Sequence, residues 1–200
     1  MTIIKDGSGK GNTAKVDSSL RMHTLSISKP NSERATAVGD SYNINTGVIG
    51  LTSTTASGVL YLKNNETRDL IIEALAVGVD SAGTTTSMTE VTVIRNPTAG
   101  TLISGATAVD MNANRNFGSS NALASTSLAY KGAEGDTFTN GTDIALFLQQ
   151  PGTRGYYAID MELEKGSSIG IKMDTDTSGG TTNVYVALIL HRIDGKNINA

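Results

Sequence analysis

The Gly-rich run Gly7-Ser-Gly-Lys-Gly, near the start of the chain, is the first pattern that could do chemistry. Phosphate-binding loops use such glycines to bring backbone N–H groups around a phosphate, and their lysine is followed by Ser or Thr at the start of a helix. Here Lys10 is followed by Gly11, only six residues precede Gly7, and no helical pattern follows. We therefore interpret the run as a flexible or interface turn and predict no nucleotide site.

A second candidate is Asp174-Thr-Asp-Thr-Ser-Gly, which matches the first half of a calcium-binding loop. In such a loop alternate side-chain oxygens converge on the ion, a Gly permits the turn, and a bidentate Glu stands at the twelfth position. The twelfth position here is Tyr185, within a strand-like segment. The pattern therefore favours a polar loop between two strands, and we predict no metal and no cofactor.

Two histidines and a pair of carboxylates are the remaining catalytic candidates. His23 and His191 lie in strand-like segments at opposite ends of the chain, and no Gly-x-Ser-x-Gly elbow accompanies them. Triads assemble in space, so sequence alone leaves one open, but we interpret both histidines as surface or interface residues. Asp160 and Glu162 share a strand face, as a glycosidase pair could. The chain has only 4% aromatic residues and no Trp to bind sugars, so we predict no enzyme.

The composition argues against several classes of protein. With no Cys among 200 residues, the chain has no disulfide, no thiolate nucleophile and no Cys-ligated metal. The net charge is -3 and the cationic residues are scattered, which argues against nucleic-acid binding. The longest apolar run, Val184 to Leu190, is far shorter than the roughly 20 residues of a membrane helix. No apolar signal-peptide region follows Met1, so we expect synthesis in the cytoplasm.

Strand-like segments recur at short intervals and end at turn residues, which is typical of an antiparallel β-sandwich. These segments are Ser57–Lys63, Leu70–Val79, Glu90–Arg95, Asp143–Leu148, Tyr156–Leu163, Ile169–Met173 and Asn183–Arg192. In the fifth of them Tyr157, Ile159, Met161 and Leu163 alternate and fall on one face. The last is apolar on both faces at its middle, which predicts a central strand.

No segment shows a sustained helical period with caps, so no helix is predicted. Glu66–Ala76 is the one alternative, because Leu70, Ile71 and Leu75 have useful helical spacing. The β-branched pair Ile71 and Ile72 favours a buried strand there.

The first 34 residues differ from the rest. Asp6-Gly-Ser-Gly-Lys-Gly-Asn is too Gly-rich to hold structure alone, yet Thr13–Asp17 and Leu20–Ser28 are strand-like. We therefore divide the chain into an N-terminal arm or hairpin, residues 1–34, and a β-sandwich domain, residues 35–200. Extended, 25 residues of arm would span roughly 80 Å and reach past an adjacent subunit. A hairpin packed on its own domain is an equally open reading.

The stretch from Asp6 to Thr24 resembles the start of a group of tailed-phage virion structural proteins. In them a Gly-rich stretch precedes Ala-Lys/Arg-Val-Asp, a Leu and the first long strand. The likeness continues through Ala37–Asn45 and Tyr61–Glu66, and Leu163–Ile171 is similar to the closing strands of phage jelly-roll capsid-decorating proteins. Residues 80–150 match no such pattern.

This resemblance implies a jelly-roll with an extended N-terminal arm, homotrimers, contact with the major capsid protein and a place on the capsid surface of the virion. The candidate interface residues are those of the arm that carry the likeness. They are Asp6, Gly7, Gly9, Gly11, Ala14, Lys15, Val16, Asp17, Leu20 and Arg21.

Three functions are compatible with these patterns. The first is a capsid decoration, or cement, protein that binds the major capsid protein lattice and stabilises the head. The second is a structural component of the tail or baseplate. The third is a receptor- or glycan-binding module of the virion, which the shortage of aromatic residues disfavours.

Overall fold

The computed structural model describes residues 31–52, 55–80, 88–105, 107–109, 113–124, 127–175 and 180–193, and the backbone of residues 4–5 and 13–14. The chain divides into two compact units, Met1–Pro30 and Asn31–Ala200. In the first unit, β1 (Ile4–Lys5) pairs antiparallel with β2 (Thr13–Ala14). The boundary expected after residue 34 falls inside the first helix of the second unit, α1 (Asn31–Val38).

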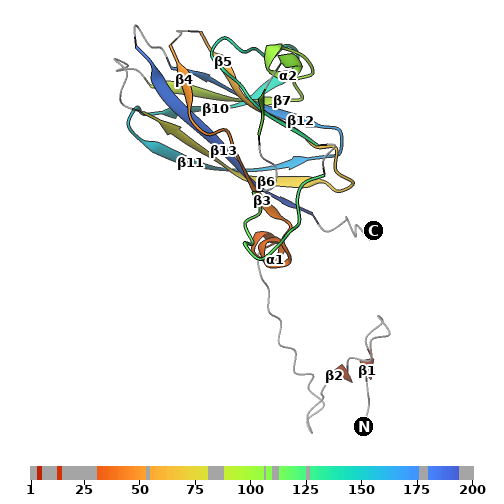
Figure 1. The fold of residues 1–200 in the computed structure, drawn as a ribbon. Helices are drawn as coiled ribbons and strands as arrows, with labels where there is room; N and C mark the ends of the chain where they lie inside the picture. Colours follow the sequence, from red (N-terminus) through yellow and green to blue (C-terminus); the bar gives the residue numbers. More distant parts are fainter. Residues whose placement is uncertain are drawn as a thin grey trace. The chain divides into compact units, whose positions relative to one another are not determined.

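Antiparallel strands build the second unit (Figure 1). They are β3 (Ser41–Asn45), β4 (Ile49–Leu51), β5 (Ser57–Lys63), β6 (Leu70–Val79), β7 (Thr89–Arg95), β8 (Thr107–Ala108), β9 (Leu128–Lys131), β10 (Thr142–Gln149), β11 (Arg154–Leu163), β12 (Ser168–Asp174) and β13 (Thr182–Arg192). Each of the seven strand segments predicted from Ser57 onward lies within one of these elements, whereas of the strand-like segments of the arm only Thr13–Ala14, in β2, is described. The segment with a possible helical reading is strand β6, so the strand interpretation is confirmed.

The strands form two sheets, one in the order β10-β7-β12-β5-β9-β8 and the other in the order β11-β6-β13-β3, with β4 also paired to β13. The pairings are nested along the chain: β3 pairs with β13, β5 with β12, β6 with β11, and β7 with β10. Nested antiparallel pairs distributed alternately over two packed sheets make a jelly roll. The predicted all-β sandwich is thus confirmed, and its strand order is the jelly roll that the resemblance implied.

The core lies between the two sheets and is formed by the inward side of each strand. Its fully buried side chains come from both sheets; the largest are Tyr42, Ile44, Leu51, Leu60, Leu62, Leu70, Ile72, Leu75, Leu102, Ile171, Met173 and Leu188. Strand β13 lies between β6 and β3, as its two-sided apolar pattern predicted. The described members of the core cluster run from Tyr42 to Leu190, all in the second unit.

The predicted alternation in β11 is also present. Tyr157, Ile159 and Met161 pack against the core and Leu163 is buried within it, while the residues between them are exposed. A β-bulge interrupts the pairing with β6 between Ala158 and Met161, where Asp160 has a φ of 41°.

The expectation of no helix was wrong, because α1 and a second short helix, α2 (Thr101–Gly105), are present. The search for a helical apolar period did not detect either helix, for the same reason. Helix α1 buries Ala35 and α2 buries Leu102, and a single buried residue makes no apolar stripe. No helix in the described part of the chain is long and apolar enough to cross a membrane.

Candidate interaction surface

Of the predicted arm interface, the structure describes only the backbone of Ala14, which lies in β2 opposite Ile4. The other predicted interface residues lie outside the described residues. They are Asp6, Gly7, Gly9, Gly11, Lys15, Val16, Asp17, Leu20 and Arg21.

The catalytic and metal candidates are not gathered into one site. Asp174 ends β12 and Tyr185 lies within β13, so the segment between them connects two strands, as predicted. Asp160 and Glu162 are exposed on β11. No group of three or more His, Asp and Glu side chains that could hold a metal occurs among the described residues.

The expectation for His191 was wrong, because it is 6% exposed and is not a surface residue; His23 lies outside the described residues. The side chain of His191 is covered because β13 is a central strand and α1 packs against it. Helix α1 covers one end of the body. We call this region the α1 end and define it as α1, Gly39, Asp40 and the loop of residues 113–121.

The chain leaves α1 through a Schellman motif. The N–H of Gly39 donates to the carbonyl of Thr36, and the N–H of Asp40 donates to the carbonyl of Ala35. Gly39 has a φ of 79°, a conformation that Gly adopts without strain. A Cβ atom at this position would lie 2.1 Å from the hydroxyl of Ser119, so glycine is needed there for space as well.

The loop of residues 113–121 is fixed to α1 by asparagine side chains. The amide of Asn116 donates to the carbonyl of Ala37, that of Asn121 to Val38, and that of Asn114 to Gly39. The last carbonyls of a helix have no partner within the helix, so these bonds complete its C-terminus. Strand β3 holds the other side of the loop, because the N–H of Asn43 donates to the carbonyl of Ala113.

Beneath this loop lies a cluster of buried charges. The guanidinium of Arg192, with a side chain 10% exposed, binds Asp40 at 3.0 Å and Glu66 at 3.0 Å. It also donates to the carbonyl of Ala122 and lies 5.1 Å from the ring centre of Tyr42. Arg68 pairs with the same Asp40 at 3.1 Å. Each carboxylate of the cluster thus has a guanidinium partner within 3.1 Å.

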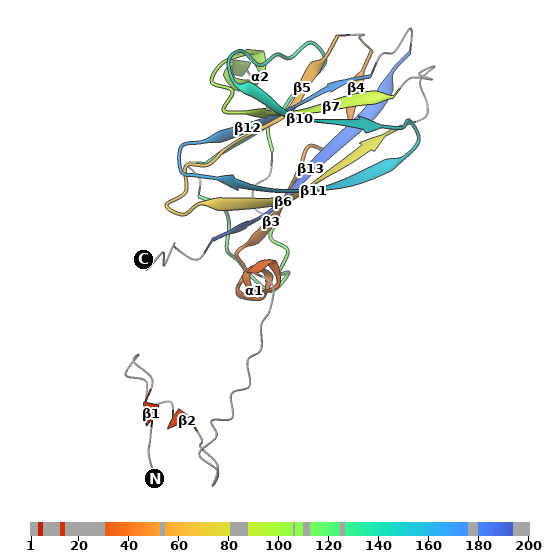
Figure 2. The same cartoon turned by 180° about the vertical axis from the view of Figure 1, so that it is seen from behind.

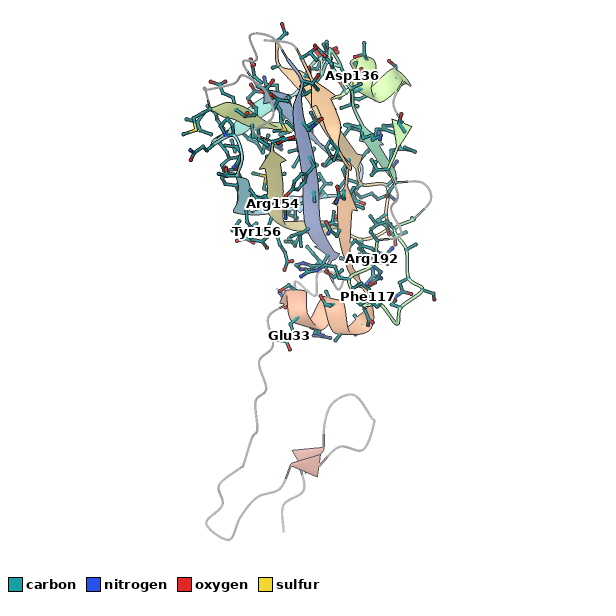
Figure 3. The ribbon with its side chains drawn as sticks, turned by 60° about the vertical axis from the view of Figure 1, so that its left-hand side comes forward. Glu33, Phe117, Asp136, Arg154, Tyr156 and Arg192 are labelled. Carbon is teal, nitrogen blue, oxygen red and sulfur yellow. The ribbon has the colours of Figure 1, made fainter. Side chains whose placement is uncertain are left out.

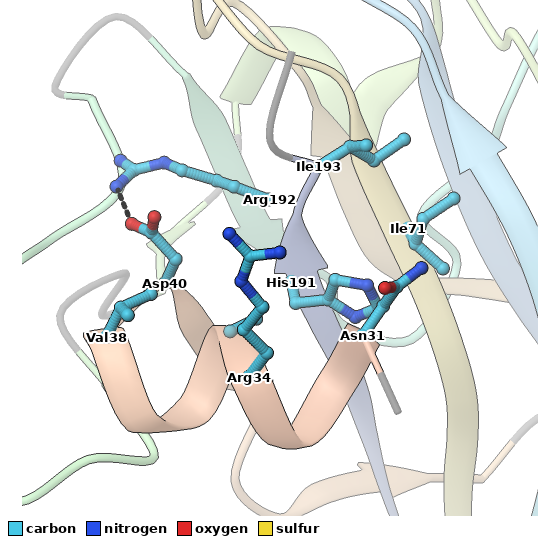
Figure 4. Close-up of a pocket in the computed structure, with 9 residues that line it drawn as sticks. Asn31, Arg34, Val38, Asp40, Ile71, His191, Arg192 and Ile193 are labelled. Carbon is cyan, nitrogen blue, oxygen red and sulfur yellow. Dashed lines mark hydrogen bonds and ion pairs between the residues drawn. The ribbon is translucent and has the colours of Figure 1, made fainter. Parts of the chain in front are cut away.

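A cavity of about 220 Å³ separates α1 from β13, and Asn31, Arg34, Asp40 and His191 are among the residues that line it (Figure 4). Burial lowers the pKa of His191, the carboxylate of Glu73 beside it opposes that shift, and Arg115 adds to it. The Nδ1 atom of His191 lies 3.6 Å from Glu73, and Arg115 pairs with the same carboxylate at 3.1 Å. Burial therefore disfavours protonation of His191 inside the fold.

The outer surface of the α1 end carries exposed apolar side chains. Phe117 is 101% exposed in the loop beside α1, and Val38 at the end of the helix is 56% exposed (Figure 3). The backbone around both is held by hydrogen bonds to the asparagine side chains, which lowers the entropy cost of ordering this surface on binding. Such an arrangement can bind an apolar hollow on another protein. Sequence reasoning missed Phe117, although a lone Phe within an Asn-rich loop was a usable signal.

No protein-family model matches the chain, and no curated protein sequence matches it. Among solved structures, a chain in the structure of infectious bursal disease virus, Gx strain, is 13% identical over 80% of this chain and 32% of that one, with a TM-score of 0.29. The chain thus spans about a third of the length of that viral chain. A likeness of this size adds nothing to the fold, which rests on the strand order, and nothing on function.

Proposed function

We propose that the chain is a structural protein of a tailed-phage virion, and that it decorates the capsid surface by binding the major capsid protein lattice and stabilising the head. The observation that carries this proposal is a separate N-terminal unit, with a virion-like sequence, ahead of a jelly-roll body. A fold alone does not imply a function, and the phage assignment rests on the resemblance of the arm and of the closing strands. In this proposal the protein is a homotrimer with no catalytic activity and no cofactor.

The physical logic is multivalency. A shell offers many equivalent sites, and a subunit that contacts two neighbours at once converts the second contact into an intramolecular one. Each contact can then be weak and polar, as the low share of charged residues, 18%, permits. Arms that reach a neighbouring subunit would join lattice junctions that no single compact domain could span.

The α1 end supports this proposal because the arm continues directly into α1. Any pull on the arm reaches residue 31 first, and α1 is held through Asp40 to Arg68 and to Arg192 of β13. Strand β13 is bonded on both sides within its sheet. A load on the arm would therefore be shared by the whole sheet.

The test is removal of residues 1–30. Residues 1–30 form a unit separate from the body, so we expect the shortened chain to keep its circular dichroism spectrum and its melting temperature within a few degrees. We also expect it to lose co-sedimentation with empty capsids of the phage that encodes it. Phe117→Ala serves as a second variant and should weaken the same binding if the α1 end contributes.

Full capsid binding by the folded, shortened chain would sink the role proposed for the arm. Labelling the protein in intact virions by immuno-electron microscopy separates head from tail. Signal on the tail or baseplate would replace the decoration function with the second structural function.

A further inference from the structure

Strand β10 exposes a row of large apolar side chains to solvent. Ile144, Leu146 and Leu148 are 45%, 58% and 58% exposed on its outer side. Strand β10 is the edge strand of its sheet, and β11, which follows it after a tight turn, is the edge strand of the other sheet (Figure 2). Tyr156 of β11 is 66% exposed (Figure 3), and Met88, just before β7, is 49% exposed. Most of the large exposed apolar side chains of the described body thus gather along one edge.

The core is also incomplete along this edge. Ala145 and Phe147 of β10, and Tyr157, Ile159 and Met161 of β11, face inward but are only partly buried. A hollow of about 310 Å³, lined by Ile144, Met161 and Ile169 among others, opens at the same place. The interior of the sandwich therefore continues to the surface between β10 and β11.

The other sheet edges are short or covered. Strand β3 is covered by the loop of residues 113–121. The N–H of Asn43 donates to the carbonyl of Ala113, and the N–H of Arg115 donates to the carbonyl of Ser41. Strand β8, at the far edge of the other sheet, is two residues long. Both are ordinary ways in which proteins prevent unwanted strand pairing.

Strand β11 is also protected. The bulge beside Asp160 interrupts its pairing geometry, and Arg154 and Glu162 place charges along it. Strand β10 is less protected: its one register irregularity and its one charge lie at its first end, at Asp143 to Ala145, and from Ala145 to Gln149 it pairs regularly with β7 and contains no charge, Pro or Gly. An apolar edge strand of this length, left open, is a template for pairing with another chain.

The charges on β10 favour a second copy of this chain as that partner. No charged residue lies between Ile144 and Gln149, so two such edges can approach without like charges meeting. The one charge of the strand, Asp143, is bound by Lys172 of its own body at 2.9 Å. A charged partner would find no opposite charge to pair with between Ile144 and Gln149. Another β10 strand offers the same apolar row, together with backbone hydrogen-bond donors and acceptors.

The size of the face sets how the copies must meet. An eight-residue strand is about 27 Å long and the sheets of a sandwich lie about 10 Å apart, so the edge alone offers about 270 Å². An interface of standard size buries ~800 Å² on each partner, so the outer side chains of β10 must supply much of the contact.

We propose that copies of this chain associate through the β10–β11 edge, with the β10 strands of neighbouring copies facing one another. This association requires no capsid, so loss of capsid binding and loss of association are separate results. A β10–β10 contact is two-fold and joins a pair of chains, so it is a contact additional to the one that would form the homotrimer of the proposed function. Leu146, at the middle of the exposed row, is the side chain that must come closest to its equivalent in another copy.

Light scattering on the purified full chain tests the proposal. We expect the wild-type protein to have the mass of an oligomer, and Leu146→Lys to lower that mass by removing the contact. Because Leu146 is 58% exposed, a lysine there lies in solvent in the single chain, and we expect an unchanged circular dichroism spectrum. Phe117→Lys, which changes an exposed apolar residue at the α1 end, is the matched control and should leave the mass unchanged.

A cross-link gives a second readout that does not depend on weakening the protein. The chain contains no Cys, so Leu146→Cys introduces a single thiol. Mild oxidation should yield a disulfide-linked pair on a non-reducing gel, and Phe117→Cys should not. A wild-type protein that is a single chain at tens of micromolar overturns the proposal, as does an oligomer in which Leu146→Lys keeps the mass and Leu146→Cys does not cross-link.

Discussion

Arg192 ties together segments that are far apart in the sequence. Its partners Asp40 and Glu66 precede it by 152 and 126 positions, and its backbone N–H donates to the carbonyl of Asp40 as well. One side chain thereby connects the end of α1, the turn before β6 and the end of β13. Removing one member of such a buried group leaves carboxylates with fewer counter-charges, which is more costly than breaking a surface pair.

We therefore expect Arg192→Met to lower the free energy of unfolding by about 3–5 kcal/mol, as measured by urea denaturation. Lys172→Met is the control, because it breaks an ion pair with Asp143 whose carboxylate is 57% exposed. That variant should cost no more than about 1 kcal/mol. Equal losses of stability in the two variants would show that the buried cluster stabilises the fold no more than a surface ion pair does.

His191 predicts a pH dependence. Its pKa in the folded protein is lowered by burial, so between that value and the ordinary value of about 6.5 the unfolded chain binds more protons than the folded one. Stability should therefore be constant above about pH 7 and should fall as the pH is lowered through 6.5. His191→Gln should remove this slope in urea midpoints measured from pH 7.5 to 5.5, above the range in which carboxylates titrate.

The chain has one other histidine, which supplies the control for that measurement. His23→Gln should keep the wild-type slope, because His23 belongs to the separate unit Met1–Pro30. If the slope is lost in His23→Gln and kept in His191→Gln, the pH dependence comes from His23, and the role given to His191 is contradicted.

Among the elements, the long strands could be predicted and the short ones could not. Strands such as β6 and β13 can be predicted because many consecutive residues between turn residues alternate or are apolar. Strand β4 is only three residues long, and α1 has one buried residue, so neither has a pattern to detect. The Gly39-Asp40 step after α1 was the available local signal, since a glycine often ends a helix in this way.

The candidate surface could be predicted even less well, for a different reason. The cluster around Arg192 depends on the register that places β13 beside β3 and on the turn that brings Glu66 alongside. Likewise, the open edge at β10 depends on which strands lie outermost in the two sheets. Local sequence determines neither, because both arise from pairing across most of the chain.

Alanine substitutions at two glycines test how closely the loop of residues 113–121 packs on the end of α1. Gly39→Ala should destabilise the fold both because of the φ of 79° and because its Cβ would contact Ser119. Gly47→Ala has a similar φ of 66° but no atom within 4 Å of the added Cβ, so it should show the conformational cost alone, about 1–2 kcal/mol. Thermal unfolding of the two variants should place Gly39→Ala clearly below Gly47→Ala; the reverse order would contradict the close packing of the loop on α1.

In the whole molecule, the nested pairing makes the first and last strands of the jelly roll neighbours. Strand β13 lies between β3 and β6 and contributes Val184, Val186, Leu188 and Leu190 to the core. No subset of the earlier strands can complete that sheet, because its centre is missing without β13. The body therefore behaves as one cooperative unit.

This arrangement predicts a sharp difference between two truncations. A chain that ends at Thr181 lacks β13, and we expect it to show no cooperative thermal transition by circular dichroism. A chain that ends at Ile193 keeps β13 and the hydrogen bond from the Ile193 N–H to Asp69, and should unfold cooperatively near the wild-type temperature. A cooperative transition in the shorter chain would show that the earlier strands can form a stable body by themselves.

The position of β13 also has a consequence in time. Because the ribosome makes this central strand after all the others, β3 and β6 emerge well before the strand that must lie between them. At about 5–20 residues per second, synthesis from β3 to β13 takes on the order of ten to thirty seconds. Throughout that interval the sheet that contains β13 is unfinished, and we expect its apolar strands to need shielding by chaperones. We therefore expect chains that lack β13 to stay unfolded and to be removed by proteases, so that only chains with β13 become available for assembly.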